Sequence, residues 1–149
     1  MKKEEYKNLP EITLKLKKSN LIQTQIKNSA DCAKIFHEIF EDTIEIYESM
    51  FALYLNRANK TIGWMKISQG GLSGCVIDNR IILKAAIESL SSGLIICHNH
   101  PSGNTRPSEA DLKVTQKLKK ACGVLEIQLL DHIILTENSY LSMTDEGLL

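Results

Sequence analysis

The sequence has no excess of charge of either sign and no long apolar run. Its 18 Lys and Arg residues equal its 18 Asp and Glu residues. A neutral chain generates no overall field that attracts nucleic acid or an anionic membrane. The first residues, Met-Lys-Lys-Glu-Glu-Tyr, lack the apolar core of a secretory signal, and no apolar stretch approaches the ~20 residues that span a bilayer. We therefore expect a cytoplasmic protein without a membrane anchor.

Cysteine is scarce and scattered. No two of the four cysteines share the C-x-x-C spacing of a zinc knuckle; they are Cys32, Cys75, Cys97 and Cys122. We interpret them as small apolar residues in a reducing compartment.

Length and hydrophobic content indicate one domain. A chain of 149 residues with 43% hydrophobic residues has enough material for one sizeable core and too little for two. Residues 1–29 are polar and rich in lysine, with one alternating apolar run at 12–16 that suggests an edge strand. We expect a polar N-terminal appendage over residues 1–29 and a single domain over residues 30–149.

The hydrophobic pattern predicts a mixed order of helices and strands. Expected helices cover residues 30–42, 78–90 and 108–123, and expected strands cover 50–56, 61–68, 94–97, 128–136 and 140–143. No internal repeat interrupts this order. It favours an α/β or α+β fold in which helices pack on a β-sheet.

Several residues have specific expected places in these elements. Asp31, Asp78 and Ser108 are expected to cap the three helices, and the single tryptophan, Trp64, is expected in the core. The apolar face of the third helix is expected to comprise Ala110, Val114, Leu118 and Ala121.

Most of the candidate metal-binding and catalytic residues lie between positions 98 and 111. His98 and His100 lie at positions i and i+2 of a strand end, so their imidazoles point to one face and can bind one ion. After a turn, the first turn of the next helix can bring Asp111 to the ion as a third ligand. The fourth tetrahedral position is then open for water, as in catalytic zinc sites. Such water needs a base outside the ligand set, and Glu48 is the candidate.

These residues match a known pattern. Glu48, followed by His-x-His-Pro, Ser108 and Asp111, resembles the JAMM motif of JAB/MPN metalloproteases. More narrowly, His-Asn-His-Pro-Ser-Gly, Leu-Asp-His-Ile-Ile at 130–134 and the closing Asp-Glu-Gly-Leu-Leu resemble the RadC family. The resemblance runs from about Glu48 to Leu149.

The resemblance implies a fold and a role for each site residue. The fold is cytidine-deaminase-like, a mixed β-sheet flanked by helices. His98, His100 and Asp111 would bind zinc, Glu48 would hold the catalytic water, and Ser108 would hydrogen-bond that water or the developing oxyanion. Longer RadC proteins carry a helix-hairpin-helix domain whose length and Gly-containing hairpins the N-terminal region does not show, so we expect a short form.

Simpler interpretations stand beside these roles. Ser108-x-x-Asp111 is also the spacing of a capping box, so Asp111 has a structural alternative. Glu48 ends an acidic stretch and could be a solvated surface carboxylate. Asn99 is expected on the opposite face of the strand with a structural role, and His132 could support the site from outside the ligand set or face a substrate.

The favoured function is a zinc-dependent hydrolase of the JAMM type that cleaves a peptide or isopeptide bond with metal-activated water. Its partner would be a peptide or protein substrate, because the neutral charge does not support nucleic acid. Two alternatives remain open: a metal-dependent nuclease or DNA-repair-associated factor, and a metal-binding interaction module without catalysis.

Overall fold

The computed structural model describes residues 23–40, 43–70 and 76–149. Its helices are α1 (Ser29–Phe40), α2 (Asn79–Glu88) and α3 (Glu109–Val124), and its strands are β1 (Ser49–Leu55), β2 (Thr61–Gln69), β3 (Gly93–Asn99), β4 (Gln128–Leu135) and β5 (Tyr140–Ser142). No helix in these described ranges has the length and apolar character needed to cross a membrane. The expected order of elements is confirmed.

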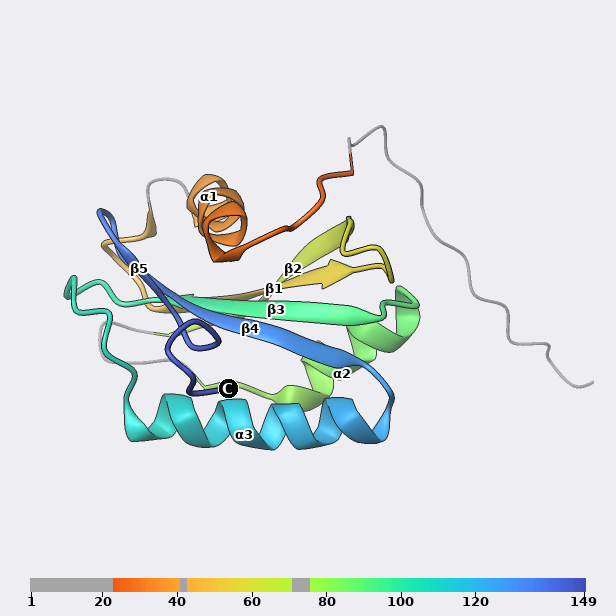
Figure 1. Ribbon diagram of the computed structural model, residues 1–149. Helices are drawn as coiled ribbons and strands as arrows, with labels where there is room; N and C mark the ends of the chain where they lie inside the picture. The colour runs from red at the N-terminus through yellow and green to blue at the C-terminus, as the bar shows by residue number, and fades with distance from the viewer. Residues whose placement is uncertain (1–22, 41–42, 71–75) are drawn as a thin grey trace, which may run out of the picture.

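The strands form one mixed sheet in the order β2-β1-β3-β4-β5. β1 pairs antiparallel with both β2 and β3, and β5 pairs antiparallel with β4. β3 and β4 are parallel, so a crossover must join them, and α3 provides it. This topology places the start of α3 at the carboxyl end of β3 (Figure 1).

Helices cover both faces of the sheet: α1 lies on one face, and α2 and α3 lie on the other (Figure 1). Phe36 and Phe40 of α1 are buried in the first core cluster, and each side chain contributes about 1.5–3 kcal/mol of hydrophobic stabilisation. Along β3, Ile95 and Cys97 belong to this cluster, whereas Ile96 belongs to the cluster beneath α2 and α3. By the two-residue period of a strand, His98 continues the face covered by α3.

The N-terminal boundary of the domain remains a prediction, but residues just before α1 contact the sheet. The Thr61 amide donates to the Thr24 carbonyl, and the Ile26 amide donates to the Asn59 carbonyl, each at 2.9 Å. Ile26 also joins the core cluster beneath α1. The alternating run at 12–16 lies outside the described residues.

Two expectations about the helices are wrong. Asp31 does not cap α1; the Asn28 side chain accepts the Asp31 amide at 3.0 Å, and Asp31 instead accepts the Lys27 amide at 2.8 Å. The helix starts earlier because Asn28 is also an effective N-cap residue. Of the expected apolar face of α3 only Leu118 is buried, and the other buried residues of the helix are Asp111, Thr115 and Cys122. The helix is rotated so that Asp111 faces the end of β3.

The expectation for Trp64 is also wrong, because 53% of this residue is exposed. Trp64 lies on β2, an edge strand of the sheet. Its ring contacts the Phe51 ring edge-on, with centroids 5.7 Å apart, and the rest of it meets solvent. Asp78 does cap α2 as expected, since its side chain accepts the Arg80 amide at 2.9 Å.

Candidate metal centre

Four side chains that can bind a metal ion converge where β3 ends and α3 begins. Glu48, His98, His100 and Asp111 each offer one ligand atom, and these atoms all lie within 4.8 Å of one another. β1 runs antiparallel to β3 with Met50 opposite His98, so Glu48, just before β1, lies at the same end of the sheet as the carboxyl end of β3. Carboxyl ends of strands are frequent ligand sites in open sheets that contain helix crossovers.

The distances among the candidate ligand atoms can be compared with those around a tetrahedral ion. His98 Nε2 lies 2.8 Å from His100 Nε2 and 3.4 Å from Asp111 Oδ1. His100 Nε2 lies 3.5 Å from Asp111 Oδ2. Ligands placed 2.0–2.1 Å from a tetrahedral zinc ion are about 3.3 Å apart. The two distances to Asp111, each to a different carboxylate oxygen, are close to this spacing, and the two imidazole nitrogens lie closer together. The three side chains are therefore a candidate set of ligands for one small ion.

The turn after β3 orients the His100 ring. His100 Nδ1 lies 2.6 Å from the Asn104 carbonyl oxygen, and a carbonyl can only accept, so Nδ1 carries the proton. Gly103 makes this turn with a positive φ of 84°, a conformation that favours glycine. In neutral His100 the lone pair is then on Nε2, toward Asp111. The Asp111 carboxylate raises the pKa of His100, and partial burial opposes this effect.

Asp111 makes the expected capping box and also lies beside both histidines, where its role as a metal ligand stays a prediction. Its Oδ2 accepts the Ser108 amide at 2.8 Å, and its own amide donates to Ser108 Oγ at 3.0 Å, which completes a capping box at the start of α3. Burial by itself raises the pKa of Asp111, but the adjacent His100 and His98 rings outweigh burial and lower that pKa below its usual range. The capping box thus fixes the carboxylate in the position from which it reaches both histidines.

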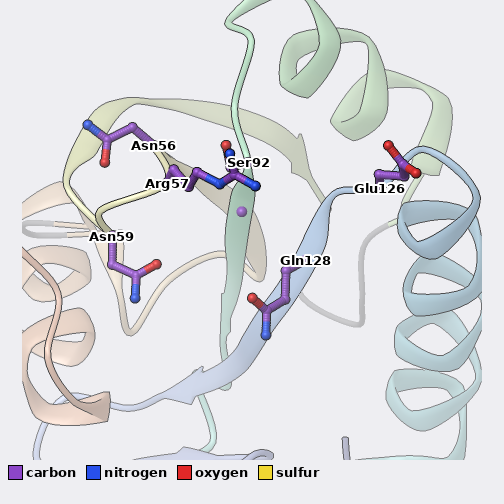
Figure 2. Close-up of a pocket in the computed structure, with 7 residues that line it drawn as sticks. Asn56, Arg57, Asn59, Ser92, Glu126 and Gln128 are labelled. Carbon is purple, nitrogen blue, oxygen red and sulfur yellow. The ribbon is translucent and has the colours of Figure 1, made fainter.

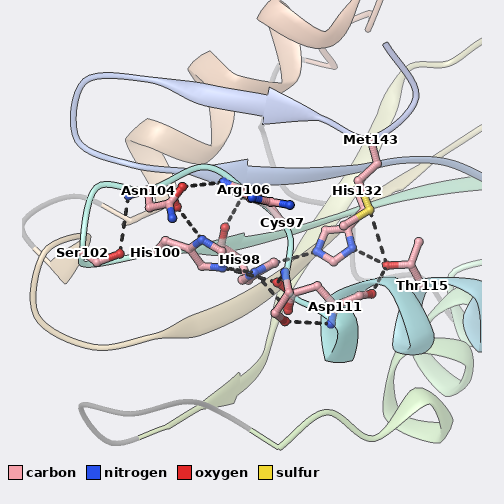
Figure 3. Close-up of polar contacts among 11 residues, drawn as sticks. Cys97, His98, His100, Ser102, Asn104, Arg106, Asp111, Thr115, His132 and Met143 are labelled. Carbon is pink, nitrogen blue, oxygen red and sulfur yellow. Dashed lines mark hydrogen bonds and ion pairs between the residues drawn. The ribbon is translucent and has the colours of Figure 1, made fainter. Parts of the chain in front are cut away.

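Behind His98 lies a chain of buried polar contacts (Figure 3). His98 Nδ1 is 2.6 Å from His132 Nε2, and His132 Nδ1 is 2.6 Å from Thr115 Oγ1. His132 is 0% exposed, and Thr115 is 1% exposed. Complete burial disfavours a charge on this ring, and it lowers the pKa of His132 well below its usual value. His132 therefore supports the candidate site through His98 and does not face a substrate.

Thr115 was not identified from the sequence as a residue near the candidate site, although its spacing from Asp111 indicated this. It follows Asp111 by four residues on one helix, and residues at that spacing share a face. Thr115 Oγ1 also donates to the Asp111 carbonyl at 2.6 Å.

Asn99 fixes the segment that carries Glu48. It lies between the two histidines but on the opposite face of β3, as expected. Its Oδ1 accepts the Ser49 amide at 2.8 Å. Its Nδ2 donates to the Ile44 carbonyl at 2.6 Å and to the Tyr47 carbonyl at 2.8 Å. The Asn99 side chain thus holds the backbone on both sides of Glu48 by hydrogen bonds.

We expect Asn99→Ala to lower the free energy of unfolding by about 2 kcal/mol or more, because each buried polar group left without a partner costs ~1–3 kcal/mol. Chemical denaturation measures the change. Asn138→Ala is the control: Asn138 is exposed, and a surface substitution of this kind changes stability by roughly 0.5 kcal/mol or less. Equal stability of the two variants would contradict the role given to Asn99.

A depression lies at the opposite end of β3, near Gly93. It has a volume of about 290 Å³, and Figure 2 shows polar side chains around it; its lining comprises Asn56, Arg57, Asn59, Ser92, Gly93, Glu126 and Gln128. Within the described part of the chain, none of these residues belongs to a group of three or more metal-binding side chains. The candidate metal group lies at the other end of the strand.

Comparison with known proteins agrees with the motif and the fold. A family model described as "RadC-like JAB domain" matches residues 26–148. A UPF0758 protein of Flavobacterium johnsoniae is 41% identical over 135 residues, which cover 91% of this chain and 55% of the relative. A UPF0758 protein of Aquifex aeolicus is 38% identical over 124 residues, which cover 83% of this chain and 52% of the relative. The chain spans about half the length of these curated relatives. The match over residues 26–148 confirms the resemblance found in the sequence, and the chain belongs to the RadC-like JAB domain family.

Proposed function

We propose that this chain is a zinc-dependent hydrolase of the JAMM type that cleaves a peptide or isopeptide bond. The observation that carries the proposal is the convergence of His98, His100 and Asp111 on one point, with Glu48 beside them. Imidazole and carboxylate ligands suit zinc. Three protein ligands are typical of catalytic zinc sites, whereas structural sites are closed by four.

Each residue has a defined task in the proposed reaction. His98, His100 and Asp111 hold the ion, and a bound zinc ion would activate water and polarise the scissile carbonyl. The Glu48 carboxylate accepts a proton from the attacking water while the oxygen of this water bonds to the carbonyl carbon of the substrate. Glu48 then gives this proton to the leaving amine as the carbon–nitrogen bond breaks. The same carboxylate thus acts first as base and then as acid.

Ser108 is proposed to stabilise the oxyanion. Its Oγ accepts the Asp111 amide, and a hydroxyl that accepts one hydrogen bond still has its own hydrogen to donate. That hydrogen is the one we assign to the oxyanion, because donors aimed at developing charge are among the most effective catalytic groups. Capping of α3 and catalysis therefore use different parts of one hydroxyl.

Ser108→Ala separates these two tasks. We expect it to keep zinc, to lose ~1 kcal/mol of stability through the missing cap, and to lower kcat by about 10²–10³-fold. Ser108→Thr keeps both the cap and a hydroxyl donor, and it should retain most of the activity. Turnover of Ser108→Ala equal to that of wild type would leave Ser108 with the capping role alone.

The test of the proposed function is turnover against panels of peptides, isopeptide-linked conjugates and nucleic acids, with zinc present and after removal of metal by a chelator. We expect cleavage of a peptide or isopeptide bond that stops without metal and returns when zinc is restored. Zinc-dependent cleavage confined to DNA or RNA would replace the proposal with a nuclease. Zinc binding without any cleavage across the panels would favour a non-catalytic metal-binding module.

A further inference from the structure

We propose that Thr115 and His132 are positioning residues that fix the tautomer of His98, so that its Nε2 lone pair faces the metal ion. The inference rests on the proposed role of His98 as a zinc ligand. A neutral imidazole carries one proton, on either Nδ1 or Nε2, and only the bare nitrogen can bind a metal. His98 Nε2 is the atom that faces His100 and Asp111, so Nδ1 must hold the proton.

The direction of the hydrogen bonds can be followed from α3. The Thr115 hydroxyl has one hydrogen, and it donates to the Asp111 carbonyl at 2.6 Å, a common bond between a threonine and the carbonyl four residues earlier in a helix. Thr115 Oγ1 must then accept from His132 Nδ1, 2.6 Å away. Met143 Sδ at 3.7 Å is a weak acceptor. The other possible acceptor is His132 Nδ1 itself, but only in the tautomer that would put the proton of His98 on Nε2.

The proton position on His132 determines the proton position on His98. A neutral His132 with its proton on Nδ1 has a lone pair on Nε2 and can only accept there. His98 Nδ1, 2.6 Å away, must therefore donate. His98 is 1% exposed, so water cannot substitute for this partner. The reverse direction would put the proton of His98 on Nε2, where it would block the metal.

A pair of histidines alone has no preferred direction, because either ring can donate to the other. The Thr115 hydroxyl supplies the preference, since the Asp111 carbonyl takes its hydrogen. Asp111 thus has two separate tasks. Its carboxylate reaches the site, and its backbone carbonyl sets the direction of the hydrogen bonds from His98 through His132 to Thr115, which orient His98. Groups that orient a ligand from behind typically change metal affinity by about 10–100-fold when they are removed.

The test compares Thr115→Val, which keeps the shape but loses the hydroxyl, with Thr115→Ser, which keeps the hydroxyl. Two-bond ¹⁵N–¹H correlation spectra of the metal-free protein report which nitrogen of His98 carries the proton. Competition with a chelator measures the Kd for zinc. We expect wild type and Thr115→Ser to have the proton on Nδ1, and Thr115→Val to lose this preference and to bind zinc about 10–100-fold more weakly.

Thr136→Val is the matched control. Thr136 is also a buried threonine, and in the described part of the chain its hydroxyl is hydrogen-bonded within a turn, to Ser139. Its loss should lower the thermal stability of the metal-free protein to an extent similar to that of Thr115→Val, but it should leave the tautomer of His98 and the Kd for zinc unchanged. A loss of zinc affinity in Thr115→Val that Thr115→Ser does not rescue, or that Thr136→Val reproduces, would reduce Thr115 to a stabilising residue.

Two outcomes separate this inference from the proposed function. A proton on Nε2 of His98 in the metal-free wild type would overturn the inference, whatever the zinc affinity. A wild-type chain that binds no zinc would overturn the proposed function, and the NMR spectrum would still decide whether Thr115 and His132 set the tautomer of His98.

Discussion

Asp111→Asn is expected to remove zinc from the protein while α3 stays folded. The wild type should carry about one zinc ion per chain, since three ligands converge at one place. Asparagine has the shape of aspartate and can still accept the Ser108 amide, so the capping box is largely preserved. It lacks the negative charge of the carboxylate that lies 3.4 Å from His98 Nε2 and 3.5 Å from His100 Nε2. Loss of a ligand should lower the affinity for zinc by more than the ~10–100-fold that is lost when a group that orients a ligand is removed.

Elemental analysis after dialysis, together with chelator competition, measures this effect. Glu109→Gln is the matched control, because Glu109 is an exposed carboxylate in the same first turn of α3 and does not belong to the candidate metal group. It removes the same charge near the helix N-terminus, worth about 0.3–1 kcal/mol at an exposed position, but should retain full zinc. Full zinc content in Asp111→Asn as well would leave Asp111 with only its capping role.

Glu48→Gln is expected to abolish hydrolysis while zinc content and fold remain those of the wild type. Glutamine keeps the size of glutamate and most of its hydrogen bonding but cannot accept a proton. A general base contributes about 10²–10⁴-fold to a rate, so activity should fall close to the background of an ordinary assay. The segment around Glu48 is held by Asn99 through backbone groups, which the substitution does not touch.

The control for this variant is Glu45→Gln. Glu45 belongs to the same acidic stretch but is exposed and lies beside Glu137, whose hydrogen bond raises the pKa of Glu45. Its substitution should leave kcat unchanged. If Glu48→Gln were as active as wild type on a peptide substrate, another residue would have to act as the base. If Glu48→Gln also lost its zinc, Glu48 would be a ligand instead of a base.

Much of the fold and of the site could be read from the sequence because it depends on local geometry. The alternation of a strand places His98 and His100 on one face, and the Ser108-x-x-Asp111 spacing starts a helix and turns a carboxylate toward that face. All of these residues lie within one segment of the chain, so no long-range pairing is needed to bring them together. Strand lengths and turns follow from local patterns for the same reason.

The tertiary structure decided what depends on which strands are neighbours. Glu48 reaches the histidines because β1 pairs with β3 in the register that sets Met50 opposite His98. His132 meets His98 because β4 lies parallel to β3. Trp64 is exposed because β2 is at the edge of the sheet. Spacing along the chain determines which face of an element a side chain occupies, but the partner across that face is set by strand order and register, which are fixed only when the whole core packs.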